Sequence, residues 1–173
     1  DEIAMNDLGA FQNVFDDIEP FKGIAPAGFI VDAFGQLTEA GFRTIWLDDP
    51  DWERDREVEL SMPTDVTDEG WFEVVNWVEA AREARDSYVM MTLGACYGAQ
   101  AVGSYLALQK LNPMPCLLVA VEGVSDNVEW VNRQFRNNGI DPDEHWIIEA
   151  ALSADSQPVM FPVGGAGLGN QSS

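Results

Sequence analysis

The stretch Gly94-Ala95-Cys96-Tyr97-Gly98 lies where a short apolar run ends and a helical pattern begins. Glycine permits the backbone angles of a tight turn and leaves room for a ligand to approach the main chain. In α/β folds, ligands bind beyond the carboxyl ends of the strands, at such a strand-to-helix turn. The alternative is that Gly94 and Gly98 only let the helix pack against the strand. The pattern is neither a P-loop nor the strict Gly-x-Gly-x-x-Gly of a dinucleotide site.

Glu122 ends the next apolar run, which begins at Cys116. An acid at the end of the second strand of such a fold can accept hydrogen bonds from both hydroxyls of a ribose. The alternative is an ordinary solvated glutamate in an acid-rich chain. Together, the glycine turn and Glu122 favour an adenosine-type cofactor.

The other reactive residues carry less information. His145, the only histidine, stands at the start of a predicted strand, where a structural role is commoner than that of a general base. Cys96 has no histidine near it in sequence to activate a nucleophile. No Cys/His cluster has ligand spacing, so we expect no metal site. The aromatic residues from Trp71 to Trp77 are interpreted as core.

Helices and strands alternate from Thr67 onward. Thr67 is the expected N-cap of a helix over about residues 68–86, with one apolar face made of Trp71, Val74, Val75, Val78 and Ala81. Apolar runs at 88–93, 116–122 and 145–153 predict strands, the first two buried, and 157–163 is a candidate fourth strand. Helices are expected at 100–111 and 126–138. This order predicts a doubly wound α/β unit with parallel strands.

The expected helix at 126–138 has signals at both ends. Asp126 and Glu129 have the spacing of a capping box, and Gly139 is placed for a C-terminal cap. The Gly-rich segment 164–173 is interpreted as flexible.

Residues 1–66 predict a β-rich extension. Strands are expected within 29–42 and 57–63, with turns at glycines, and 47–57 is interpreted as a charged loop.

The composition is strongly acidic, with 30 Asp and Glu against nine Lys and Arg and a formal charge of −21. Such a surface repels nucleic acid and anionic membranes, so neither is an expected partner. The acidity indicates either an ordinary soluble surface or adaptation to high salt. Two cysteines favour a reducing compartment, and no apolar run reaches the roughly 18 residues of a membrane span, so we expect a cytoplasmic protein.

The segments PTDVTDEGWFEVVNWVEAAREARDSYVMMTLGACYGAQAV and LLVAVEGVSDNVEWVNRQFRNNGIDPDEHWIIEAALS resemble the FkbM-type S-adenosylmethionine-dependent methyltransferases. The resemblance extends from about Pro63 to Phe161, and VDAFGQLT is similar to a segment found upstream of the domain in such proteins. It implies a Rossmann-like class I methyltransferase fold over 67–173. The complete fold of the family has more strands than are expected here, so the resemblance implies only its N-terminal part.

The resemblance also implies roles for individual residues. The loop under the methionine part of S-adenosylmethionine would contain Gly94, Ala95, Cys96 and Gly98, and Glu122 would hold the ribose. Ala150 and Ala151 would lie beside the adenine. The family usually has an acid where this chain has Thr92, and that acid helps to orient the methionine amine.

The resemblance implies methylation of a hydroxyl on a small-molecule, sugar or glycan acceptor, and we identify no catalytic base. A non-catalytic Rossmann-like module that binds a nucleotide or a partner is the first alternative. An NAD-linked enzyme is the second.

Overall fold

The centre of the molecule is a sheet of three parallel strands. The computed structural model describes residues 11, 13–43, 50–62, 69–154, 157 and 160. Strands β5 (Tyr88–Leu93), β6 (Cys116–Glu122) and β7 (Trp146–Glu149) pair in the order β5-β6-β7. Tyr88 pairs with Cys116, and Glu122 pairs with Glu149, so all three strands end at the same edge of the sheet. The predicted parallel strands and their α/β alternation are confirmed.

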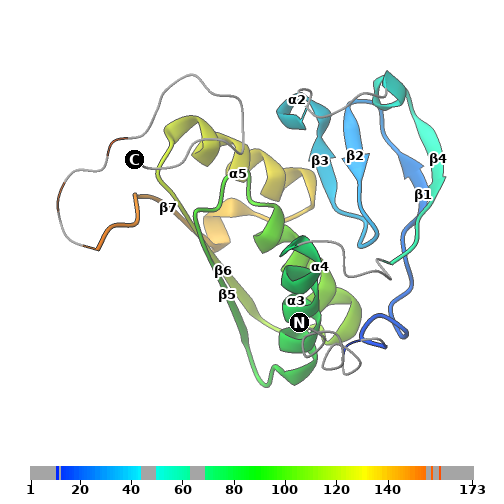
Figure 1. Cartoon of the computed structure of the whole chain (residues 1–173), viewed down its shortest axis with the longest axis horizontal. Helices are drawn as coiled ribbons and strands as arrows, with labels where there is room; N and C mark the ends of the chain where they lie inside the picture. The colour runs from blue at the N-terminus through cyan, green and yellow to red at the C-terminus, as the bar shows by residue number, and fades with distance from the viewer. Residues whose placement is uncertain are drawn as a thin grey trace, which may run out of the picture.

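Helices cover one face of this sheet, as Figure 1 shows. They are α3 (Glu69–Glu83), α4 (Ala99–Leu111) and α5 (Ser125–Asn137). The residues of α3 predicted to face the core are buried at Trp71, Val75, Val78 and Ala81. Thr67, the expected cap of α3, lies outside the described residues. Together, the sheet and its helices are compatible with a Rossmann-like core.

The sequence signals predicted the C-terminal end of α5 correctly and its N-terminal end incorrectly. The prediction that Asp126 and Glu129 form a capping box is wrong. The helix begins one residue earlier than expected, and its N-cap is Val124, which makes no side-chain cap hydrogen bond. Asp126 therefore lies in the first turn instead of at the cap. The C-terminal cap at Gly139 is confirmed: its φ is 74°, and the next amide, Ile140 N, donates to Phe135 O at 3.0 Å.

The prediction that the strands are buried on both faces is wrong for β5. Val89, Met91 and Leu93 alternate along the strand, and each is more than half exposed. The alternate side chains face the helices, and Tyr88 and Thr92 among them are 5% exposed. Among the described elements, the helices pack on one face of the sheet only. Every second side chain of β5 is therefore exposed, and the strand is not buried on both faces as expected.

The N-terminal region is rich in strands, as predicted, although no strand was expected at Lys22–Ala25; the strands pair antiparallel. β1 (Lys22–Ala25) pairs with β4 (Arg56–Glu59), and β2 (Phe29–Val31) pairs with β3 (Leu37–Glu39). The strand expected through Phe42 ends at Glu39, because the chain turns into the short helix α2 (Ala40–Arg43). The 3-10 helix η3 (Pro50–Glu53) lies within the predicted charged loop. The division between 66 and 67 falls outside the described residues and stays a prediction.

This region packs against α5. The amide of Leu37 donates to Asn138 Oδ1 at 2.8 Å, and the Asn138 side chain donates back to Leu37 O at 2.8 Å. The Gln134 side chain donates to Thr38 Oγ1 at 3.1 Å. The hairpin of β2 and β3 is therefore fixed on the helix that follows Glu122 in the chain.

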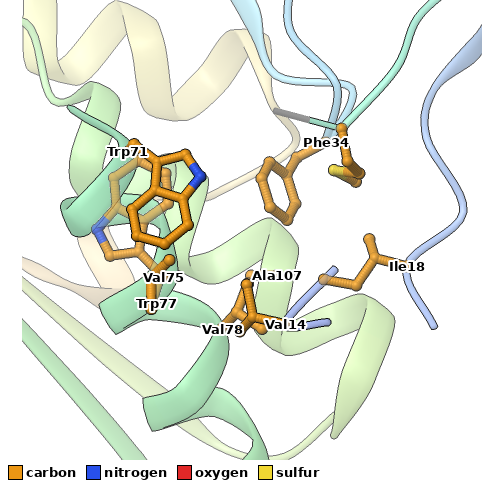
Figure 2. Packing of buried hydrophobic residues seen from close by; sticks show 9 residues of the cluster. Val14, Ile18, Phe34, Trp71, Val75, Trp77, Val78 and Ala107 are labelled. Atoms are coloured by element: carbon orange, nitrogen blue, oxygen red, sulfur yellow. The ribbon is translucent and has the colours of Figure 1, made fainter. Parts of the chain in front are cut away.

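The largest apolar cluster lies between α3, α4 and the N-terminal region, and Figure 2 shows its members. The ring of Phe34 meets Trp77 with centroids 6.5 Å apart. Gly103 of α4 permits this packing, since a Cβ there would lie 2.4 Å from the Trp77 ring. Trp71 and Trp77 are buried core residues, as predicted, whereas Phe72 is 43% exposed.

The C-terminal part adds β7 after the 3-10 helix η4 (Pro142–Glu144). The candidate fourth strand at 157–163 lies mostly outside the described residues, and Gln157 and Met160 are not in a strand. The segment 164–173 lies wholly outside them. None of the helices in the described ranges has the length and apolar character that a membrane span requires.

Candidate functional site

The glycine turn forms a corner at the carboxyl end of β5. Residues 94–98 connect β5 to α4, and Gly94, Cys96 and Gly98 all have positive φ, at 80°, 52° and 86°. The amides of Gly94 and Ala95 both donate to the carbonyl oxygen of Val121 in β6, at 2.9 Å each. The corner is therefore attached directly to the neighbouring strand. We call residues 94–98 the glycine corner.

The two glycines of the corner have different surroundings. A Cβ built on Gly94 meets no atom within 4 Å, so the space beside it is open. A Cβ built on Gly98 would lie 3.3 Å from Val131 Cγ1 and 3.6 Å from Phe135 Cε1, both in α5. Gly98 therefore lets α4 and the corner pack against α5, which is the alternative role expected for the glycines from the sequence. Only Gly94 leaves space that a ligand could enter.

Glu122 faces the glycine corner from the end of β6. Its side chain is buried, at 6% exposure, so the interpretation as a solvated surface glutamate is wrong. Oε2 accepts a hydrogen bond from Cys96 N at 2.7 Å, and Oε1 accepts one from Val124 N at 2.9 Å. The side chain of Asn127 lies 3.5 Å from Oε1. A carboxylate offers about four lone-pair sites, so Glu122 retains acceptor capacity beyond these bonds.

The thiol of Cys96 is unsuited to nucleophilic chemistry. Burial, together with the negative charge of Glu122, raises its pKa to about 11. The thiol is therefore neutral at pH 7, and the thiolate is the reactive form of cysteine. Cys96 contributes its backbone amide, which donates to Glu122 Oε2.

Thr92 lies two residues before Gly94, on the helix-covered face of the sheet. It is 5% exposed, and its Oγ1 has no hydrogen-bond partner among the described residues. An unpaired buried hydroxyl is costly, on the order of 1–3 kcal/mol. The resemblance implies an acid at this position, whereas the side chain here is a neutral hydroxyl.

Ala150 and Ala151 follow β7 and are exposed. The amide of Ala150 donates to Glu122 O at 2.9 Å, which places Ala150 beside the end of β6. The preceding residue, Glu149, accepts a hydrogen bond from Ser125 Oγ at 2.5 Å. Glu149 was not predicted as a site residue, although it lies at a strand end on the same edge as Glu122, and that position is a signal that could have identified it.

An aromatic cluster beside the glycine corner was also not predicted from the sequence. The ring of Tyr97 lies 4.3 Å from that of Phe42 in α2, with an interplanar angle of 35°. Phe42 also meets Trp130 of α5 edge-on, with centroids 5.3 Å apart. The guanidinium of Arg133 lies 4.2 Å above the Trp130 ring and pairs with Glu39. The N-terminal region therefore contacts the corner, a long-range contact with no local sequence signal.

His145 lies at the amino end of β7, away from the corner. Its Nδ1 accepts a hydrogen bond from Leu118 N at 3.3 Å, and its ring meets Phe135 with centroids 5.8 Å apart. Burial lowers its pKa, although Glu144 and Asp141 act in the opposite direction. These contacts give it a structural role. Within the described ranges, no group of three or more His, Cys, Asp or Glu residues could hold a metal ion.

Comparison with known proteins gives no match: no family model, no curated protein and no solved structure is significantly similar to the chain. The function of the site must therefore be argued from its own geometry.

Proposed function

We propose that the chain is an S-adenosylmethionine-dependent methyltransferase that methylates a hydroxyl of a sugar, glycan or other small molecule. One observation carries the proposal: the buried carboxylate of Glu122 lies 2.7 Å from Cys96 N, at a corner where Gly94 borders open space. A carboxylate that could accept hydrogen bonds from a ribose therefore lies beside open space at the main chain, at the edge where parallel α/β sheets bind ligands.

The residues of the corner fit such a cofactor in part. Gly94, Ala95 and Cys96 would lie under its methionine part, Glu122 would accept from its ribose, and Ala150 and Ala151 would border its adenine. Gly98 would act indirectly, by letting α5 pack under the loop. Thr92 would offer a hydroxyl in place of the usual acid.

When bound, S-adenosylmethionine supplies an electrophilic methyl group on a sulfonium. The chain would then mainly align an acceptor oxygen with that methyl, which requires orientation more than strong base catalysis. The only histidine lies at the other end of β7, so we assign no catalytic base.

A non-catalytic module that binds a nucleotide or a partner is the second candidate. The specific observation in its favour is Thr92, because a buried neutral hydroxyl replaces the acid expected at the methionine amine. Such a module would keep the ribose acceptor Glu122 and lack methyl transfer.

Calorimetric titration with S-adenosylmethionine, S-adenosylhomocysteine and NAD tests the proposal. We expect S-adenosylmethionine and S-adenosylhomocysteine to bind, and we expect Glu122→Ala to weaken their binding. Glu129→Ala serves as a control, because Glu129 is an exposed acid of α5. Equal or tighter binding of NAD would reject the assignment. Binding without transfer to any hydroxyl acceptor would favour the non-catalytic module.

A further inference from the structure

The turn at Cys96 has a backbone conformation that cysteine does not favour. Its φ of 52° lies in the left-handed region, which residues with a Cβ rarely adopt. In this conformation the amide of Cys96 donates to Glu122 Oε2 at 2.7 Å. A strained residue of this kind persists only where the surrounding structure fixes it firmly. Glu122 supplies one such contact, and the side chain of the next residue, Tyr97, supplies a second.

The second contact comes from the N-terminal region. The ring of Tyr97 lies 4.3 Å from that of Phe42 in α2. Phe42 is 6% exposed, and it also meets Trp130 of α5 edge-on. Aromatic rings in contact stabilise a structure by more than the apolar area that they bury. Phe42 therefore contacts both the glycine corner and α5.

The helix α2, which contains Phe42, has four residues and is held in place through the strand before it. Glu39, the last residue of β3, accepts hydrogen bonds from Arg133 Nε at 3.0 Å and from Asn137 Nδ2 at 2.8 Å. Both donors belong to α5, which also bonds to the two preceding residues of β3 and its flank. The attachment of β3 to α5 therefore sets the position of Phe42.

We propose that Phe42 is a positioning residue of the candidate site. Through Tyr97 it holds the turn at Cys96 in the conformation that presents the Cys96 amide to Glu122. Phe42 is buried, so it acts through the glycine corner and not by contact with a ligand. The N-terminal region is then part of the support of the site, and the effect on ligand affinity rests on the proposed function.

Hydrogen exchange of the ligand-free, ¹⁵N-labelled protein tests the positioning role without a ligand. Phe42→Ala should speed exchange of the Cys96 amide by about tenfold relative to the amides of β6 in the same variant, because the turn loses one of its two contacts. A loss of global stability alone would speed exchange at both places alike.

Phe34→Ala is the matched control. Phe34 is also a buried phenylalanine of the N-terminal region, at 5% exposure, but its ring meets Trp77. It lies in the turn between β2 and β3, whereas α2 follows β3 at the other end of this hairpin (Figure 1). Phe34→Ala should leave the exchange of the Cys96 amide, relative to β6, unchanged.

Calorimetric titration with S-adenosylhomocysteine measures the consequence for the ligand. Phe42→Ala and Tyr97→Ala should each weaken binding by about tenfold, and the double variant should bind no more weakly than either alone, because both changes remove the same contact. Fully additive losses would show that Phe42 does not act through Tyr97, and would overturn the proposal.

The two measurements separate this proposal from the proposed function. If the unmodified protein does not bind S-adenosylhomocysteine, the proposed function fails, and the exchange of the Cys96 amide alone decides the role of Phe42. Unchanged relative exchange in Phe42→Ala, or an equal change in Phe34→Ala, would overturn that role. Circular dichroism checks folding, and Phe42→Leu, which keeps apolar volume without the ring, takes the place of Phe42→Ala if that variant does not fold.

Discussion

Gly94 provides the sharpest test of whether the glycine corner binds a ligand, because its two expected effects can be separated. Replacing it with alanine adds one methyl group to a residue with φ +80° and no atom within 4 Å of the new Cβ. The cost in stability is then backbone strain alone, about 1–2 kcal/mol, which lowers the melting temperature by about 2–4 °C per kcal/mol in a chain of this size.

Gly139→Ala is the matched control for that strain. Gly139 has φ +74°, and its new Cβ would also meet nothing within 4 Å, but it lies at the end of α5, beyond the corner. Both variants should melt at similar temperatures. Only Gly94→Ala should weaken the binding of S-adenosylhomocysteine, by at least about tenfold or 1.4 kcal/mol, because the new methyl group would occupy the space of the ligand.

Gly98→Ala completes the series. Its new Cβ would add a contact of 3.3 Å with Val131 Cγ1 to the strain of φ +86°, so we expect a cost of about 2–5 kcal/mol. Differential scanning calorimetry and ligand titration on the three variants measure both effects. Unchanged affinity in Gly94→Ala, or an equal loss in Gly139→Ala, would refute a ligand at this corner.

Three other predictions concern charge. Glu122→Ala should weaken cofactor binding by about 1–3 kcal/mol, the loss expected for hydrogen bonds to a charged group, and unchanged affinity in a folded variant would leave Glu122 a purely structural acceptor. Because burial lowers the pKa of His145, the folded state binds fewer protons at this residue than the unfolded state does. The contribution of His145 to stability is therefore full above about pH 6.5 and decreases as the pH falls. His145→Gln should make the denaturation midpoint depend less on pH between about pH 7.5 and 5.5, and an unchanged pH profile would contradict this. If the −21 charge is an adaptation to salt, the melting temperature should rise between about 0.01 M and 1 M sodium chloride as the Debye length shortens from about 30 to 3 Å, whereas a flat or falling curve would leave an ordinary acidic surface.

The sequence predicted the parallel half of the fold well, because its signals there are local and periodic. The apolar spacing of Trp71, Val75 and Val78 predicted α3, and the apolar runs ending at Leu93 and Glu122 predicted β5 and β6. Burial was less predictable. An apolar strand has the same composition whether one face is covered or two, and the alternating exposure of β5 depends on which elements pack against it.

The candidate site shows the same limit. The positions of Gly94 and Glu122 at strand ends could be predicted, since a parallel sheet brings such ends to one edge. The bond from Cys96 N to Glu122 and the contact of Tyr97 with Phe42 could not, because both depend on how loops distant in sequence pack together. The packing of Gly98 against α5 likewise required the position of Val131.

The central claim is that an adenosine-type cofactor binds at the glycine corner beside Glu122. Amide chemical shifts of the ¹⁵N-labelled protein, followed during titration with S-adenosylhomocysteine, test it most directly. The largest changes should occur at Gly94, Ala95 and Cys96, with further changes at Glu122 and Ala150. Saturating ligand that leaves these amides unmoved, or that moves only residues at the opposite end of the sheet near His145, would contradict it.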